Sequence, residues 1–283
     1  MRDATKRAYR TSDPETGKDL AVVGRDTKKI DSYALATGKP LFVDDVDMPG
    51  MLIAKVLWSP KAHAMIERID TSAAEAMAGV HAVLTHENVP RIPHTTAGQG
   101  YPEPSPYDTV VLDNKVRFVG DRVAVVAAET RAIAEAAVKA ITVEYRELPP
   151  VFDCEAALEE GAPVIHDQDD VSIPIPVPYE PERNLAAHVD FEVGTVDAAL
   201  SSAHVTAGGR YETHYGQHCP IEPHLAIAYM DAYDRVVIRT STQVPFHVRR
   251  IVAQSLGIPV KRIHVIKPRI GGGFGTKQEV LIE

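Results

Sequence analysis

The sequence is short of cysteine, of long apolar runs and of positive charge, and each shortage excludes a class of protein. Its two cysteines, Cys154 and Cys219, cannot build a disulfide framework, an iron–sulfur cluster or a tetrathiolate zinc site. Thirty Lys and Arg against thirty-nine Asp and Glu give a net charge of −9, which argues against binding to nucleic acid or to anionic lipid. The longest apolar run, Val123 to Ala128, is far shorter than the about 20 residues of a membrane span.

The composition therefore predicts a soluble, cytoplasmic protein. Residues 1–19 are charged and have no apolar run behind them, so they predict a mobile lead-in rather than a secretory signal. The total of 283 residues predicts about two domains.

Strand and helix patterns alternate in the first half of the chain. Predicted strands cover residues 52–58, 80–84, 116–119, 122–127 and 142–146, with a turn at Gly120–Asp121 between the third and the fourth. A short helix is predicted from Thr71–Ser72 to Met77, and a longer one from the cap Thr130 to Ile141. Helical spacing puts one apolar face of the longer helix against a sheet: Ile133, Ala136, Ala137, Ala140 and Ile141. The mixture predicts a small α/β or α+β domain.

Residues 149–184 carry seven prolines and the acidic run Asp167, Asp169 and Asp170. Because proline removes a backbone donor and restricts its neighbour, this stretch is predicted to be a connector.

Beyond the connector, strands are predicted over residues 205–215, 225–230 and 236–241, and again over 262–267. Between the last two lies a predicted helix with Pro245 in its first turn and Gly257 as its C-cap. Its predicted buried stripe is Val248, Ile251, Val252 and Leu256, while Arg249 and Arg250 are assigned to a solvated face.

The strongest local site pattern is the run Gly271–Gly275 after the last predicted strand. Consecutive glycines allow positive φ and expose backbone N–H groups, and Thr276 onward is predicted to begin a helix whose N-terminus favours an anion. The spacing matches neither G-x-G-x-x-G nor a P-loop. Cofactor binding and a tight turn with close packing therefore remain as two open interpretations.

Two further clusters have structural interpretations. The spacing of His214, His218, Cys219, Glu222 and His224, interrupted by prolines, favours hydrogen bonding over a metal site. Ser241, Thr242 and Gln243 form a capping and turn pattern before the predicted Pro245 helix.

The apolar run Val280, Leu281 and Ile282 precedes the last residue. A helix of about two turns is marginal in water. We therefore expect the chain to be a fragment, or this end to be covered by another polypeptide.

Taken in order, the motifs have a specific resemblance. They are Asp31–Gly38, Phe42–Asp45, Val116–Asp121, Gln217–Pro223, Ser241–Gln243 and Gly271–Gln278. From about residue 24 onward the chain resembles the molybdenum-binding subunit of bacterial xanthine dehydrogenases, in the molybdenum hydroxylase family. The resemblance implies an α+β chain with an α/β hammerhead domain at 24–148, a connector at 149–184, and the N-terminal part of a molybdopterin-binding domain at 185–283.

The resemblance also implies a cofactor, molybdopterin in its cytosine dinucleotide form with molybdenum. It implies hydroxylation of a purine or related N-heterocycle, with water as the oxygen source and electrons passing to Fe–S and FAD groups on partner chains. By family position Gln243 would hydrogen-bond a molybdenum oxo ligand, and Gly272, Gly273, Phe274 and Gly275 would line the metal and the pterin. Gln278 stands where animal xanthine enzymes carry a substrate-orienting glutamate.

The family's general-base glutamate and second substrate-positioning arginine lie downstream of the segment present. We therefore expect no complete catalytic set in this chain, which would be inactive without the remaining molybdenum domain. Two alternatives stay open: a relative that acts on an aldehyde, nicotinate or another N-heterocycle, and a non-catalytic assembly module.

Overall fold

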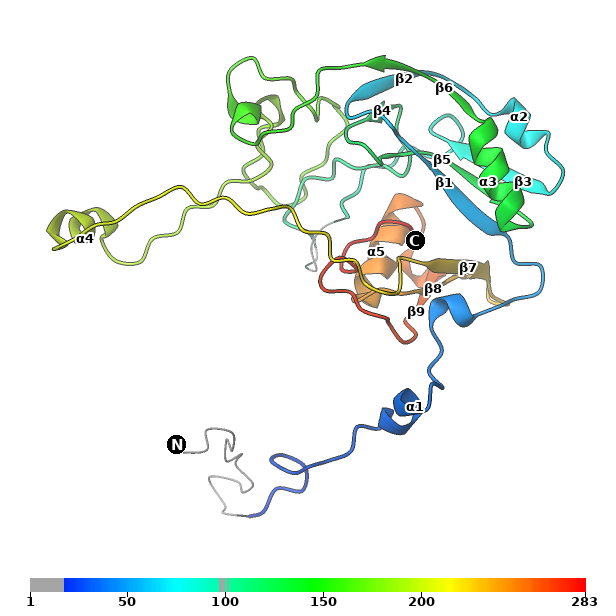
Figure 1. The fold of residues 1–283 in the computed structure, drawn as a ribbon, viewed down its shortest axis with the longest axis horizontal. Helices are drawn as coiled ribbons and strands as arrows, with labels where there is room; N and C mark the ends of the chain where they lie inside the picture. Colours follow the sequence, from blue (N-terminus) through cyan, green and yellow to red (C-terminus); the bar gives the residue numbers. More distant parts are fainter. Residues whose placement is uncertain (1–17, 97–99, 101) are drawn as a thin grey trace. The chain divides into compact units, whose positions relative to one another are not determined.

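The computed structural model describes residues 18–96, 100 and 102–283 (Figure 1). The chain divides into two compact units, residues 1–41 and residues 42–283. The described part of the first unit contains one short helix, α1 (Ser32–Ala36). Most of the lead-in predicted at residues 1–19 lies outside the described residues. Among the described residues, no helix combines the length and the apolar character needed to cross a membrane.

The second unit opens with a 3-10 helix, η1 (Val43–Asp45), and two three-stranded antiparallel sheets. The first sheet has the order β1 (Ile53–Trp58), β5 (Arg122–Ala128), β3 (Val80–Thr85). The second has the order β4 (Lys115–Val116), β2 (Ala64–Asp70), β6 (Thr142–Glu147). β5 lies in the centre of its sheet, and its valines and alanines are buried or half-buried on both faces.

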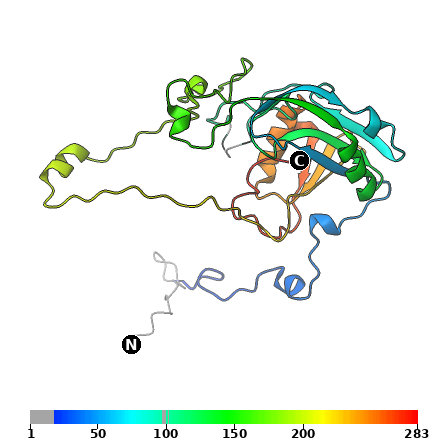
Figure 2. The same cartoon turned by 45° about the horizontal axis from the view of Figure 1, so that its top comes forward.

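Two helices pack on these strands, α2 (Ser72–Glu75) and α3 (Arg131–Ala140), and α3 lies against β1 and β5 (Figure 2). Both were predicted, as was the cap of α3: the Thr130 hydroxyl oxygen accepts the N–H of Ile133 at 3.2 Å. The predicted buried face of α3 is rotated by about one residue, since Ala134 is buried and Ala136 is exposed. The architecture is therefore α+β, as expected.

The strand–turn–strand predicted around Gly120–Asp121 is present, but its two strands do not pair with each other, because β4 belongs to one sheet and β5 to the other. The turn instead binds a third segment, since Ser59 donates its N–H to the Asp121 carbonyl at 2.8 Å. β2 was not predicted at all, and a register irregularity between Ile66 and Arg68 breaks the alternation that reveals strands.

The connector contains two 3-10 helices, η2 (Ala156–Leu158) and η3 (Pro181–Arg183). Ion pairs made by its acidic run hold the connector against the preceding strands and loops. Asp167 accepts from Lys115 Nζ at 2.7 Å, and Asp170 accepts from Arg91 Nε at 2.8 Å. The connector is therefore irregular in backbone and is held by ion pairs.

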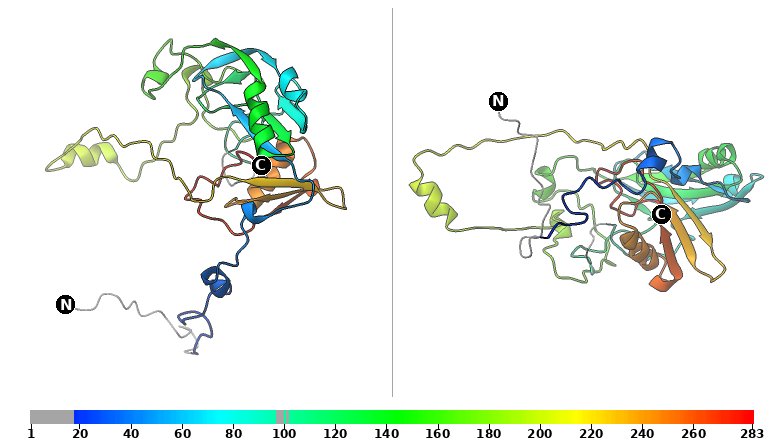
Figure 3. Two further views of the ribbon diagram at one scale, coloured as in Figure 1. Left: turned by 45° about the vertical axis from the view of Figure 1, so that its right-hand side comes forward. Right: turned by 90° about the horizontal axis from the view of Figure 1, so that it is seen from below.

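The prediction of a strand over residues 205–215 was wrong. This stretch is extended but has no ladder partner in the described part of the chain, and Tyr211 and Tyr215 are exposed. Figure 3 shows it as one of two extended arms joined by a helix that the sequence did not predict, α4 (Val196–Ser202). Alternation indicates a strand only where a neighbour completes its hydrogen bonds.

The third sheet has the order β7 (Ala226–Met230), β8 (Val236–Thr240), β9 (Ile263–Ile266). β7 and β8 are antiparallel, whereas β8 and β9 are parallel and joined through α5 (Pro245–Ser255) and η4 (Val260–Arg262). The three strands and α5 were predicted, including Gly257 after the helix with φ +64°, but η4 was not. Val248, Ile251 and Val252 are buried as expected, but Leu256 is 43% exposed because it lies past the last helical turn.

The helix predicted from Thr276 is absent. The chain forms turns there, with the N–H of Thr276 donating to the Gly273 carbonyl at 2.9 Å and that of Gln278 to Gly275 at 3.1 Å. Val280 is buried against α5 and β8 and holds the segment by tertiary packing. So short a helix would have gained little from its own hydrogen bonds.

Candidate functional site

The parallel pair β8 and β9 determines where the predicted site residues meet. Because the two strands run in the same direction, their carboxyl ends lie at the same edge of the sheet. The segment 241–244 leaves β8 at that edge, and the glycine loop, defined as residues 271–275, follows β9 there. Residues far apart in sequence are thus brought together by a single crossover.

Gln243 is held at both its backbone and its side chain. Its N–H donates to the Lys277 carbonyl at 2.8 Å, and its Oε1 accepts the N–H of Gly275 at 3.0 Å. A backbone N–H can donate only to the amide oxygen, so this bond decides which way the amide faces. No described residue accepts a hydrogen bond from Nε2, which is therefore available to an acceptor outside this chain segment.

The glycine loop touches Gln243 too closely for any side chain. A Cβ at Gly273 would lie 2.4 Å from Gln243 Oε1 and 2.7 Å from its Cδ. Gly272 and Gly275 have φ of +97° and +100°, which side chains rarely allow. These observations bear out the interpretation of a tight turn with close packing.

The loop also presents free backbone donors. Within the described residues, no hydrogen bond engages the N–H groups of Gly272, Gly273 and Phe274. Phe274 adopts φ +52° and is 73% exposed. Three consecutive N–H groups beside an amide donor can bind a group rich in acceptor oxygens or nitrogens. The predicted anion site at a helix N-terminus is wrong, however, because no helix follows the loop.

Gln278 lies one turn beyond the loop, where its backbone N–H bonds to Gly275. All six residues assigned to the cofactor or the substrate are therefore within one short stretch around the β8–β9 edge: Gln243, Gly272, Gly273, Phe274, Gly275 and Gln278. Their roles remain predictions, and this shared position supports them.

The histidine and cysteine cluster is divided among separate structural contacts. His224 donates from Nε2 to the Thr276 carbonyl at 3.0 Å, and Glu222 pairs with Lys277. His214 and Cys219 are exposed. Across the described residues, no group of three or more His, Cys, Asp and Glu side chains is placed to hold a metal ion. Hydrogen bonding by Glu222 and His224 follows the expectation.

The assignment of Arg249 and Arg250 to a solvated face was wrong. Arg249 donates from Nε to the Ile263 carbonyl at 3.0 Å, and Arg250 donates to the Glu103 carboxylate at 2.9 Å. Glu103 is 2% exposed, and His247 Nδ1 lies 3.4 Å from the same carboxylate. This cluster joins α5 to the first part of the unit. It was missed because its charged partner lies 147 positions away in sequence.

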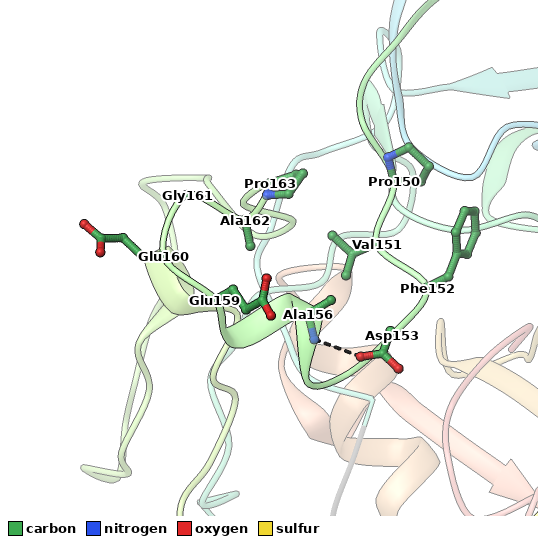
Figure 4. A pocket seen from close by; sticks show the side chains of 10 residues that line it. All are labelled: Pro150, Val151, Phe152, Asp153, Ala156, Glu159, Glu160, Gly161, Ala162 and Pro163. Atoms are coloured by element: carbon green, nitrogen blue, oxygen red, sulfur yellow. Dashed lines mark hydrogen bonds between the residues drawn. The ribbon is translucent and has the colours of Figure 1, made fainter.

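A hollow of about 380 Å³ lies elsewhere, in the connector around residues 150–163 (Figure 4). Asp153 caps the local turn by accepting the N–H of Ala156 at 2.8 Å, and Glu160 projects away from the other lining residues. None of the predicted site residues lines it. The hollow is a product of local turn geometry, and the chemistry-bearing groups lie at the β8–β9 edge.

Comparison with known proteins matches both parts of the chain. Residues 37–149 fit the family model described as aldehyde oxidase and xanthine dehydrogenase, a/b hammerhead domain, and residues 178–283 fit the molybdopterin cofactor-binding domain. The chain is 41% identical over 293 aligned residues to "Probable hypoxanthine oxidase XdhD" of Escherichia coli (strain K12), covering 95% of this chain and 30% of that protein. It is 34% identical to "Nicotinate dehydrogenase large molybdopterin subunit" of Eubacterium barkeri, covering 94% of this chain and 58% of that protein.

The fold is similar to that of a solved Cu,Mo-CO dehydrogenase, with a TM-score of 0.73 and 31% identity over 90% of this chain and 32% of that one. The chain thus spans about a third of the length of the first relative and of this solved structure.

Proposed function

This chain belongs to the molybdenum hydroxylase family of aldehyde oxidases and xanthine dehydrogenases, and we propose that it is part of a xanthine dehydrogenase-type molybdenum subunit. The observation that carries the proposal is the contact of Gln243 with the glycine loop at the β8–β9 edge. Both lie in the part that matches a molybdopterin cofactor-binding domain. We assign residues 24–148 to the hammerhead domain, 149–184 to the connector and 185–283 to the cofactor-binding part.

The residues present fit such a cofactor. Gln243 has an amide whose Nε2 donates to no described residue, and the same holds for three loop N–H groups beside it. A molybdopterin, in its cytosine dinucleotide form, supplies two-electron redox chemistry with water as the oxygen source. Gln243 would hold the metal end of the cofactor by donating its Nε2–H to an oxo ligand. The N–H groups of Gly272, Gly273 and Phe274 bind neighbouring acceptor atoms.

Gln278 is assigned to the substrate. Its side-chain amide both donates and accepts hydrogen bonds, whereas a carboxylate at this position only accepts. A purine or related N-heterocycle offers both kinds of group. The electrons would leave through Fe–S and FAD groups on partner chains, since the two cysteines of this chain, Cys154 and Cys219, cannot ligate a cluster. The general base is assigned to the remainder of the molybdenum domain.

A second candidate is a nicotinate hydroxylase. Two observations favour it: the similarity to the nicotinate dehydrogenase subunit, and Gln278 in place of the glutamate expected for xanthine. An amide can bind a carboxylated pyridine without the repulsion between two carboxylates.

The test is to purify the complex that contains this chain, measure molybdenum and pterin per chain, and follow reduction of NAD or a dye. Xanthine, hypoxanthine, nicotinate and an aldehyde serve as substrates. We expect near-stoichiometric molybdenum and the fastest reduction with a purine, while preference for nicotinate would select the second candidate. An intact complex without molybdenum or pterin would contradict both and leave a non-catalytic assembly module.

A further inference from the structure

Lys277 and Glu222 form a buried ion pair next to the glycine loop. The proposed function assigns no role to either side chain. The Lys277 side chain is 1% exposed and that of Glu222 is 10% exposed, with Nζ and Oε2 2.9 Å apart. Removing two charges from water costs several kcal/mol for each ion, and apolar replacements are often as stable. Stability alone is therefore a weak reason for this pair.

The same carboxylate oxygen also binds the start of the loop. Glu222 Oε2 accepts the N–H of Gly271 at 2.7 Å, while Lys277 stands just after the end of the loop. The Lys277 carbonyl in turn accepts the N–H of Gln243 at 2.8 Å. The Glu222–Lys277 ion pair thus connects both ends of the glycine loop to Gln243, whose side-chain amide belongs to the candidate site.

The glycine loop packs closely against Glu222 at one end and against Gln243 near its middle. A Cβ at Gly271 would lie 2.5 Å from the Glu222 Cβ, and one at Gly273 would lie 2.4 Å from Gln243 Oε1. Glu222 Oε1 is buried and has no hydrogen-bond partner in the described part of the chain. The carboxylate is therefore held by Lys277 and Gly271 alone, and without Lys277 it keeps a single donor.

We propose that Glu222 and Lys277 are positioning residues that hold the glycine loop against Gln243. The pair acts through the backbone, and neither side chain is assigned to the cofactor or the substrate. Its effect is to keep the N–H groups of Gly272, Gly273 and Phe274 aligned with the Gln243 amide. This inference rests on the proposed function, because the alignment matters for a bound cofactor.

The test uses the purified complex and two variants, Lys277→Met and the doubly apolar Glu222→Met/Lys277→Met. Amide hydrogen exchange of a peptide spanning residues 271–277 reports loop order without turnover. The EPR signal of Mo(V), kcat per bound molybdenum and KM report alignment of the site. Lys115→Met is the matched control, because the Lys115 side chain is also buried, at 5% exposure, but pairs with Asp167 in the connector.

We expect Lys277→Met to accelerate loop exchange, alter the Mo(V) signal and lower kcat per molybdenum about 10- to 100-fold with little change in KM, as for lost orienting contacts around a metal. The double variant should regain thermal stability but neither loop protection nor kcat. Lys115→Met should lower only the Tm. If Lys277→Met does not assemble, the double variant alone decides.

A double variant with wild-type loop exchange and kcat would overturn the inference, as would a Lys277→Met variant altered only in Tm. A wild-type complex without molybdenum or pterin contradicts the proposed function instead, and the exchange data still report whether the pair holds the loop.

Discussion

Gln243 accepts the backbone N–H of Gly275 through its side-chain oxygen at 3.0 Å, across 32 positions of sequence. This bond uses the amide oxygen of Gln243 as an acceptor and leaves its Nε2 donor without a partner among the described residues. It forms only because β8 and β9 are parallel and end at the same edge. The orientation of the amide is therefore a property of the crossover that includes α5.

The variant Gln243→Glu tests the Nε2 donor of that amide separately from its Oε1 acceptor. A glutamate keeps an oxygen for the Gly275 N–H but loses the Nε2 donor, so the fold should persist. Loss of one preorganised donor at a reacting centre typically lowers kcat about 10²- to 10³-fold. Steady-state rates per bound molybdenum, together with an unchanged Tm, check this expectation. A variant as active as the wild type would remove Gln243 from the site.

Gly273→Ala tests the close approach of the loop to Gln243. Gly273 lacks the positive φ of its neighbours, so the only penalty is the Cβ at 2.4 Å from Oε1. Misplacement by about 1 Å can cost roughly 100-fold in rate. The matched control is Gly208→Ala, where a Cβ meets nothing within 4 Å. Molybdenum content and kcat should fall in the first variant and stay constant in the second.

Glu103→Leu tests the cluster that joins α5 to the first part of the unit. It removes a buried carboxylate that binds Arg250 at 2.9 Å and accepts the N–H of Gly100 at 3.0 Å. Removing the carboxylate partner of a partly buried guanidinium should cost about 2 to 4 kcal/mol. Glu180→Leu, whose partner Arg183 is exposed, should cost less than about 1 kcal/mol. Thermal midpoints of the two variants provide the comparison, and equal shifts would show that the cluster adds no stability.

The lowered pKa of His94 predicts that the free energy of unfolding depends on pH. Burial lowers the pKa of His94 below its ordinary 6.5, and nearby Arg122 lowers it further, against the opposing effects of the Ile92 carbonyl and Asp108. Burial also lowers the pKa of His166. Below pH 6.5 the unfolded chain therefore binds protons that the folded chain does not, so stability is lost as the pH falls from 6.5 toward the folded pKa values.

His94→Asn should flatten that loss, because an asparagine amide can donate to the Ile92 carbonyl as Nδ1 does at 3.0 Å and does not titrate. Tm measured at intervals below pH 6.5 checks it. A slope equal to the wild type in His94→Asn would show that this ring is not the source.

Elements with local determinants could be predicted from the sequence. The Thr130 hydroxyl caps α3 and Gly257 ends the α5 region, and both are short-range effects. Pairing could not be predicted: Val116 and Val123 lie on either side of one turn but belong to different sheets. A strand was likewise predicted at 205–215 from the local sequence, although no neighbouring strand pairs with it among the described residues.

The site was predicted only to the extent that its residues stand in recognisable motifs. Gln243 and the glycine loop were assigned by resemblance, and the parallel strands explain why they meet. Lys277 was missed because a lysine is expected at the surface, and nothing local reveals that Glu222 lies opposite it. Its position two residues after Gly275 is the one signal that could have drawn notice.

The turn between β7 and β8, at Asp231–Asp234, lies at the opposite end of β8 from the candidate site. β8 runs from this turn toward Gln243, and its five residues at about 3.3 Å each separate the two ends by roughly 16 Å. In a chain whose exposed Cys154 and Cys219 are replaced by serine, a small fluorophore on Tyr233→Cys would therefore lie at a fixed distance from the glycine loop without touching it. Such a label makes cofactor loading observable by energy transfer in real time.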